Sequence, residues 1–235
     1  NARGRSHGRR TPRLVTPVLS VSRVARQFGR RRVLRDITFD GFPGEVVGLL
    51  GPNGSGKTTL LGVLSTLAEP SRGSVTYPAL ADGDTPRRAI GVLGHEPQLY
   101  GELTARENLA LFARLAGVAD VPSAVARALE QARLADRGDD PTERFSRGMR
   151  QRLAFERVLL PEPRLLLLDE PFTGLDDDSA HRMVTRLAAL RDAGACIVLA
   201  THDLLLVERL VDRAFIVKGG VLVPLDRTLS LAEAY

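Results

Sequence analysis

The eight residues from Gly51 to Thr58, with the sequence GPNGSGKT, constrain this chain more than any other stretch. They follow the pattern of a glycine, any four residues, Gly-Lys and then Ser or Thr. Residues 45–50 form a short apolar run that predicts a buried strand, and residues 58–66 have the apolar periodicity of a helix. A strand, a glycine-rich turn and a helix in this order predict a loop whose backbone N–H groups and following helix N-terminus face a phosphate.

The residue types of this loop indicate the phosphates of a nucleotide. Lys57 can place a compact charge between the β- and γ-phosphates, and Thr58 can offer its hydroxyl to Mg²⁺. Of the 33 basic residues only Lys57 and Lys218 are lysines, which favours a position where a point charge is needed. The expected binding residues of the loop are Gly51, Pro52, Asn53, Gly54, Ser55, Gly56, Lys57, Thr58 and Thr59.

Acidic and imidazole side chains follow two further apolar runs. Residues 165–168 are four leucines, which predict a strand buried on both faces, and Asp169 and Glu170 come directly after them. Ligands bind at the carboxyl ends of strands in open α/β sheets. We therefore expect Asp169 to hold Mg²⁺ through water and Glu170 to polarise a water for attack on the γ-phosphate. His202 follows the apolar run 196–200 and is a candidate contact of the γ-phosphate.

The residues alone do not decide the role of Phe28 or of the segment that contains Ser146 and Gly148. Phe28 follows a first expected strand at residues 18–23. As an isolated aromatic it is more often part of a core than a platform on which a base stacks. Ser146 and Gly148 stand at the start of an expected helix that runs to about residue 160. Such a helix N-terminus can hold a phosphate, but many helices begin in this way.

The chain length and composition indicate one globular α/β domain. Of the 235 residues, 43% are hydrophobic and 26% are charged. Residues 18–235 are expected to form this domain, with a helical subdomain inserted at about residues 98–160. Residues 1–17 are expected to be a disordered basic tail that accounts for much of the net charge of +5. A solvated arm is the simpler interpretation of this tail, and contact with acidic lipid head groups is the alternative.

Three protein classes are excluded or disfavoured by the composition. No apolar run approaches the roughly 18–20 residues that span a bilayer, so no transmembrane segment is expected. The first residues have no apolar core of the kind found in a signal peptide. A single cysteine, Cys196, cannot form an internal disulfide, which fits a cytosolic protein.

Together these motifs resemble the nucleotide-binding subunit of an ATP-binding-cassette (ABC) transporter, over residues 18–223. The resemblance implies a P-loop NTPase core with an antiparallel β subdomain and an inserted α-helical subdomain. It implies ATP and Mg²⁺ as cofactors, Phe28 as the aromatic that stacks on adenine, and Glu170 as the catalytic glutamate. It also makes residues 51–58 and 165–169 the Walker A and B motifs, residues 173–176 the D-loop and His202 the switch histidine.

The chain departs from the family pattern at two places. Residues 145–149 read FSRGM where the family signature reads LSGGQ, and the phosphate-contacting positions Ser146 and Gly148 are retained. His95 stands where the family has the glutamine of the Q-loop, and Gln98 comes three residues later. The link between Mg²⁺ and the membrane partner is therefore either lost or made by His95.

The resemblance also implies how the protein works. ATP would be clamped in a homodimer, between the Lys57 loop of one subunit and Ser146 of the other. The partner would be an integral membrane permease, with the ATPase bound peripherally at the cytoplasmic face of the inner or cell membrane.

The cargo is predicted from a narrower resemblance. Residues 94–97, 103–109 and 169–172 are most similar to the ATPase subunit of the bacterial haem exporter of cytochrome c maturation. One alternative is the ATPase of an exporter of drugs, lipids or polysaccharides. The other is not a transporter subunit but a soluble cassette ATPase that acts on nucleic acid or ribosomes. Soluble members usually carry two cassettes or a coiled-coil insertion, so no specific nucleic-acid partner is expected.

Overall fold

The computed structural model describes residues 15–80 and 86–225. Most of the expected basic tail, residues 1–14, lies outside the described residues, as do residues 226–235 at the other end. Within the described ranges, none of the helices combines the length and the apolar character needed to cross a membrane.

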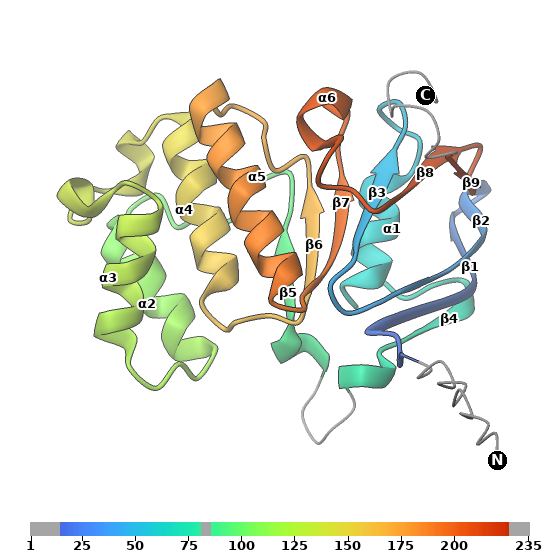
Figure 1. Ribbon diagram of the computed structural model, residues 1–235, viewed down its shortest axis with the longest axis horizontal. Helices are drawn as coiled ribbons and strands as arrows, with labels where there is room; N and C mark the ends of the chain where they lie inside the picture. The colour runs from blue at the N-terminus through green and yellow to red at the C-terminus, as the bar shows by residue number, and fades with distance from the viewer. Residues whose placement is uncertain (1–14, 81–85, 226–235) are drawn as a thin grey trace, which may run out of the picture.

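A six-stranded sheet forms the centre of the molecule, in the order β5-β6-β7-β3-β8-β9 (Figure 1). Neighbouring strands are parallel except for β8 and β9, which form an antiparallel hairpin. The strands are β3 (Val46–Leu50), β5 (Ile90–Leu93), β6 (Leu165–Asp169), β7 (Cys196–Ala200), β8 (Arg213–Lys218) and β9 (Val221–Pro224). The apolar runs at residues 45–50, 165–168 and 196–200 are therefore present as β3, β6 and β7, which lie next to one another.

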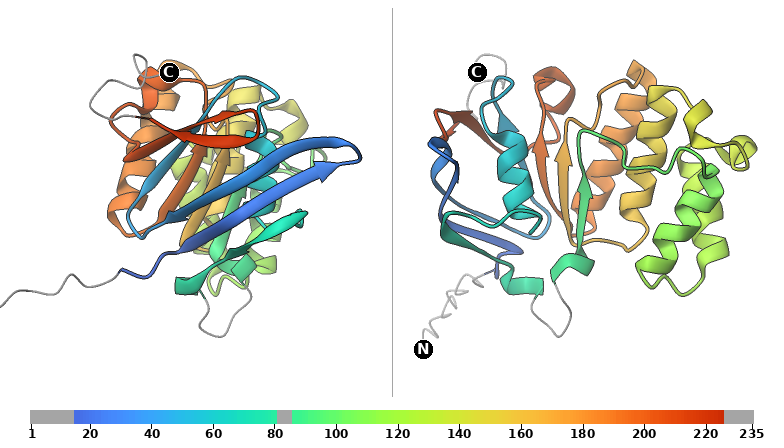
Figure 2. Two further views of the ribbon diagram at one scale, coloured as in Figure 1. Left: turned by 90° about the vertical axis from the view of Figure 1, so that its right-hand side faces the viewer. Right: turned by 180° about the vertical axis from the view of Figure 1, so that it is seen from behind.

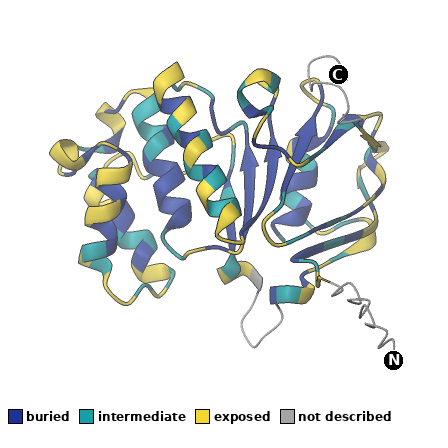
Figure 3. Cartoon of the chain, in the orientation of Figure 1, coloured by how far each residue is buried: buried dark blue, intermediate teal, exposed yellow. Residues whose placement is uncertain are grey.

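Both faces of this sheet are covered, which explains why its strands are almost wholly apolar. Val47 and Leu49 belong to a core shared with α1 (Lys57–Leu64) and the antiparallel sheet. Val46 and Leu50 point to the other side, where α4 (Arg147–Leu159) and α5 (Asp177–Asp192) pack. The central strands accordingly form the buried layer in Figure 3.

The antiparallel subdomain is a three-stranded sheet in the order β2-β1-β4, made of β1 (Leu19–Phe28), β2 (Arg31–Gly41) and β4 (Arg72–Thr76). Figure 2 shows the β1–β2 hairpin extending to one side of the molecule. The first strand was expected to end at residue 23, and this boundary is wrong. Register shifts between Val21 and Gln27 interrupt the alternation of buried and exposed residues, which hides the second half of the strand in the sequence.

The inserted helices form a block at the far end of the molecule from the antiparallel sheet (Figure 1). α2 (Ala105–Leu115) and α3 (Val121–Gln131) pack against α4 around a core that includes Leu109, Leu129, Phe145 and Leu153. The capping box at Thr104 and Glu107 is present at the start of α2. The predicted architecture is thus confirmed, whereas the limits 98–160 stay a prediction.

Short helices complete the described chain. The turn α6 (Leu204–Val207) follows β7, and single 3-10 turns occur at Pro78–Leu80, Pro86–Ala89, Ala135–Arg137 and Thr142–Arg144.

Asn108 is a buried polar residue that should contribute strongly to the helical block. Its side chain is fully buried; the amide accepts from the N–H of Tyr100 and donates to the carbonyls of Tyr100, Leu103 and Thr104. We expect Asn108→Ala to lower the free energy of unfolding by about 2 kcal/mol, because buried backbone groups lose their partner. Urea denaturation would measure this. Gln131→Ala, which removes an exposed amide on α3, is the control and should change it by less than about 0.5 kcal/mol.

Candidate nucleotide-binding site

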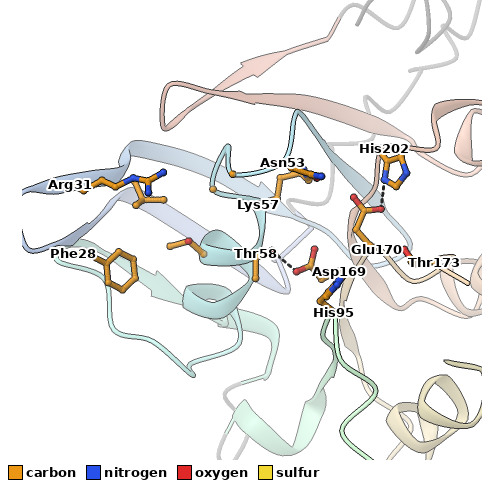
Figure 4. Close-up of a pocket in the computed structure, with 14 residues that line it drawn as sticks. Phe28, Arg31, Asn53, Lys57, Thr58, His95, Asp169, Glu170, Thr173 and His202 are labelled. Atoms are coloured by element: carbon orange, nitrogen blue, oxygen red, sulfur yellow. Dashed lines mark hydrogen bonds and ion pairs between the residues drawn. The ribbon is translucent and has the colours of Figure 1, made fainter. Parts of the chain in front are cut away.

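The carboxyl ends of four adjacent strands bring the expected residues together. β5, β6, β7 and β3 are neighbours, and each is followed by a part of the site. They enclose a pocket of about 700 Å³ with Phe28 and Arg31 at one end and Glu170 and His202 at the other (Figure 4). The residues that line it are Phe28, Arg31, Val33, Asn53, Gly54, Gly56, Lys57, Thr58, Thr59, His95, Asp169, Glu170, Thr173 and His202.

The glycine-rich loop holds Lys57 against its own backbone. Lys57 is 6% exposed, and its Nζ donates to the carbonyl oxygens of Gly51 at 2.7 Å and Pro52 at 3.2 Å. Gly51 has a φ of 142°, and a Cβ there would lie 2.8 Å from the carbonyl oxygen of Val217. Only glycine fits at this point, since both the conformation and the space exclude a side chain. The ammonium group is thereby positioned at the pocket before a ligand enters.

Thr58 and Asp169 supply two hard oxygen atoms at one point of the pocket. The Thr58 hydroxyl donates to Asp169 Oδ2 over 2.6 Å, although the two residues come from different elements. Mg²⁺ prefers oxygen ligands and usually takes one or two from the protein, with nucleotide phosphates and water completing its shell. This pair fits Mg²⁺, and when bound the ion would stabilise negative charge on the phosphate oxygens.

Glu170 and His202 form a pair beside the phosphate loop. Glu170 Oε2 lies 2.8 Å from His202 Nδ1, and the Glu170 N–H donates to the carbonyl of Ala200, which ties the tip of β6 to β7. Glu170 has a φ of 51°, an uncommon conformation for a residue with a side chain. Its Oε1 is buried and accepts no hydrogen bond from any described residue. The carboxylate thus has one oxygen held in place and one oxygen free for a ligand.

Phe28 lies at the pocket and not in the core. It is 51% exposed, and the guanidinium of Arg26 lies 4.7 Å from its ring centroid. The core interpretation, which residue statistics favoured, is therefore wrong, because Phe28 ends the hairpin strand beyond the packed part of the sheet. Arg31 and Val33 also line the pocket and were missed. Arg31 pairs with Phe28 across the hairpin, and the correct strand boundaries would have revealed it.

The exposed ring of Phe28 makes a direct test of base stacking feasible. We expect Phe28→Ala to weaken ATP binding about tenfold, because stacking on an aromatic side chain contributes about 1–3 kcal/mol per base. Folding stability should hardly change, since half of the ring is already in solvent. A fluorescent-nucleotide titration would measure the affinity. Leu67→Ala, at a residue that is 75% exposed and does not line the pocket, is the matched control.

His95 follows β5 and lines the pocket with an exposed side chain. Gln98 has a φ of 49° and does not line the pocket; its carbonyl oxygen lies 3.4 Å from Arg157 Nη1. Of the two residues considered for the Q-loop position, His95 is therefore the one in reach of a ligand. Its role in a link to Mg²⁺ stays a prediction.

Ser146 and Gly148 lie at the start of α4 and do not line this pocket. Ser146 is exposed, and its Oγ accepts from the Met149 N–H, as expected of an N-cap. Gly148 packs closely on the turn after β6, because a Cβ there would lie 2.8 Å from the carbonyl oxygen of Gly174. Thr173, one residue earlier, lines the pocket. The turn 173–176 therefore connects the pocket directly with the start of α4.

The same turn ends in the cap of α5. The Asp176 carboxylate accepts from the Ser179 N–H over 2.7 Å, and hydrogen bonding to Ser179 holds the pKa of Asp176 below its usual range. The turn is thus fixed at its far end by a helix cap.

Comparison with known proteins agrees with this geometry. The family model described as ABC transporter matches residues 34–173. Among curated proteins, the chain is 36% identical over 213 residues to Nod factor export ATP-binding protein I of Rhizobium etli, covering 88% of this chain and 67% of that protein. It is 38% identical over 205 residues to the protein of the same name from Bradyrhizobium diazoefficiens, covering 84% and 66%. The chain thus spans about two thirds of the length of these relatives.

Solved structures show the same fold. The ATP-binding subunit of an ABC transporter superposes with a TM-score of 0.83 at 34% identity, covering 93% of this chain and 98% of that one. A cassette described as dimeric, in a post-hydrolysis state with ADP and Pi, gives a TM-score of 0.77 at 26% identity, covering 87% and 96%.

The matched family model extends over more than half of the chain, and it includes the phosphate loop, the start of α4, Asp169 and Glu170. The chain therefore belongs to the family of ABC transporter ATP-binding subunits, and it is an ABC-type ATPase.

Proposed function

We propose that this chain is the ATPase of an ABC exporter whose cargo is built on lipid or carbohydrate. The observation that carries the proposal is its identity of 36–38% to proteins named for Nod factor export, over more than four fifths of this chain. Nod factor is a lipo-oligosaccharide. These relatives favour the lipid or polysaccharide alternative over haem export, which none of them supports.

The residues of the pocket divide the work on ATP between binding and hydrolysis. Phe28 would stack on the base, and the loop of Lys57 would hold the phosphates with its N–H groups and its ammonium charge. Thr58 and Asp169 would hold Mg²⁺. His95 would make the link between Mg²⁺ and the membrane partner.

Glu170 would act as the base that orients the attacking water. Its buried Oε1 is unpartnered and can accept a hydrogen bond from that water, whereas Oε2 is held by His202. Because His202 Nδ1 faces Glu170, the other ring nitrogen is the one left for the γ-phosphate.

A homodimer would complete the site. Ser146 is exposed and outside the pocket of its own chain, and the α4 N-terminus offers N–H groups with no acidic residue in the first turn. A second subunit could present these groups to the γ-phosphate, as the dimeric state described for the similar cassette suggests. The turn 173–176 would then transmit closure of one half-site to the other, because it contacts both the pocket and Gly148.

Transport requires a permease, with the ATPase attached peripherally at the cytoplasmic face of the membrane. The experiment that tests this is affinity purification from gently solubilised native membranes, with identification of the co-purified proteins. A permease linked to lipid or glycan export supports the proposal. Haem-handling proteins of cytochrome c maturation would restore the haem exporter. Ribosomes or DNA without a permease would refute the transport role and leave the ATPase assignment intact.

A further inference from the structure

A second concave and strongly basic site lies on the antiparallel sheet. A pocket of about 400 Å³ opens between β1, the following turn, β2 and the start of β4. It is lined by Ala25, Arg26, Gln27, Gly29, Arg32, Leu34, Arg35, Ser71 and Arg72. Four of these residues are arginines, and none of them is acidic. We call this site the arginine pocket.

The guanidinium groups of the arginine pocket are not neutralised. Arg32, Arg35 and Arg72 are exposed, and they form neither an ion pair nor a side-chain hydrogen bond with any residue in the described part of the chain. Some arginines elsewhere in the described chain do have acidic partners, as in Arg106–Asp139 at 2.8 Å and Arg213–Glu45 at 3.0 Å. Several like charges around one cavity repel one another and raise the local positive potential. An anion in the pocket would relieve this repulsion.

The walls of the arginine pocket are held together by the backbone. The Ser71 N–H donates to the carbonyl of Ala25 over 2.7 Å, and the Gln27 N–H donates to Ser71 Oγ over 3.1 Å. Arg26 Nη1 donates to the carbonyl of Glu69 over 2.5 Å. These bonds fix the segment before β4 onto β1 and leave the hydroxyl hydrogen of Ser71 available as a donor. The pocket is thus formed before any ligand binds, which lowers the entropic cost of binding.

The arginine pocket is distinct from the nucleotide pocket, although both use the β1–β2 hairpin. Phe28 and Arg31 pair across the hairpin and line the nucleotide pocket. The next pair inward, Gln27 and Arg32, lines the arginine pocket. No residue lines both pockets, and the guanidinium of Arg26 in the arginine pocket lies 4.7 Å from the ring centroid of Phe28 in the nucleotide pocket.

We propose that the arginine pocket binds a phosphate-bearing anion, either a phosphate monoester or diester. Planar guanidinium groups match the oxygens of phosphate through paired hydrogen bonds, which is why arginine clusters recognise this group. A small hollow on a short sheet suits one phosphate group better than a nucleic-acid duplex, whose phosphates form an extended line. A phospholipid head group and a free phosphate ester share this chemistry. The proposal rests on the pocket alone and does not depend on the transport role.

The test uses the full chain with its nucleotide site saturated by ADP, so that the Lys57 loop does not compete. One arm measures co-flotation with phosphatidylcholine vesicles that contain or lack phosphatidylglycerol. The other arm measures binding of glycerol phosphate by calorimetry. The variant carries Arg32→Gln, Arg35→Gln and Arg72→Gln. Its matched control carries Arg114→Gln, Arg133→Gln and Arg209→Gln, three exposed arginines outside the arginine pocket, and has the same net charge.

We expect the pocket variant to bind the anion at least about tenfold more weakly than the wild type, with the control variant unchanged. The wild type, the pocket variant and the control variant should bind ADP with equal affinity, which verifies that all three are folded. If the pocket variant binds ADP more weakly, the single substitution Arg72→Gln replaces it. If glycerol phosphate does not reduce co-flotation with the vesicles, the ligand of the arginine pocket is a lipid head group. If glycerol phosphate binds in solution, the ligand is a free phosphate ester. Equal binding by the pocket and control variants, or no binding in either arm, overturns the proposal.

Discussion

Glu170→Gln should bind ATP with the affinity of the wild type and hydrolyse it about 10²–10⁴-fold more slowly, the usual contribution of a positioned general base. Glutamine has nearly the shape of glutamate, so the fold around β6 and the contact to Ala200 should persist. What disappears is the negative charge of a carboxylate that lines the pocket. The bound nucleotide should therefore remain ATP for many wild-type turnovers.

The retained ATP should also shift the protein towards a dimer. If Ser146 of a second subunit contacts the γ-phosphate, hydrolysis is the event that releases it, and a variant blocked before hydrolysis should accumulate in the closed state. Steady-state phosphate release and size-exclusion chromatography with ATP would measure the two effects.

The matched control for this change is Glu130→Gln, at an exposed glutamate on α3 outside the nucleotide pocket. It should leave turnover and dimerisation unchanged. If Glu170→Gln turns over ATP within about twofold of the wild-type rate, Glu170 is not the general base. Loss of ATP binding would instead mean that the charge on Glu170 matters for the ground state.

The parallel strands and their tips could be predicted because a strand buried on both faces has to be apolar throughout. Residues 165–168 and 196–200 therefore stand out from the chain, and polar residues directly after them must emerge at one edge of the sheet. The sequence therefore predicts Asp169, Glu170 and His202 near the phosphate loop. The direct contacts of Thr58 with Asp169 and of Glu170 with His202 depend on rotamers, which the pattern does not give.

The antiparallel sheet was harder to predict, and so were the residues of the β1–β2 hairpin that line the nucleotide pocket. Irregular register breaks the period of two, so the length of β1 was underestimated and the pairing of Phe28 with Arg31 could not be identified. Arg31, Val33 and the arginine pocket were missed for this single reason. The signature segment illustrates a different limit, because the proposed contact of Ser146 with a second subunit cannot be recognised by proximity within one chain.

The cargo also could not be predicted, because the residues that bind and hydrolyse ATP do not determine which substrate is transported. The pocket residues explain ATP chemistry, and the same set serves exporters of unrelated substrates. Short motif similarity pointed to haem, whereas identity over more than four fifths of the chain points to relatives named for Nod factor export. The longer comparison carries more weight because it rests on 213 and 205 aligned residues and not on three short motifs.

Lys57→Ala should weaken ATP binding about 10²-fold. Lys57 Nζ can exchange its hydrogen bonds to the carbonyls of Gly51 and Pro52 for bonds to phosphate oxygens when ATP enters. Hydrogen bonds to charged groups contribute about 1.5–3 kcal/mol each, so losing one or two gives an effect of this size. The remaining N–H groups of the loop should keep a weak affinity for phosphate, and ADP should lose less than ATP because it lacks the γ-phosphate.

This chain offers an unusually clean control, because its only other lysine is Lys218. Lys218 is exposed at the end of β8 and lies outside the nucleotide pocket. Lys218→Ala removes the same charge and the same number of atoms, and should leave nucleotide affinity within about twofold of the wild type. Isothermal titration with ATP and with ADP would compare the two variants. Equal affinities in both would show that the glycine-rich backbone and the helix N-terminus hold the phosphates without the lysine, and that the charge serves the transition state alone.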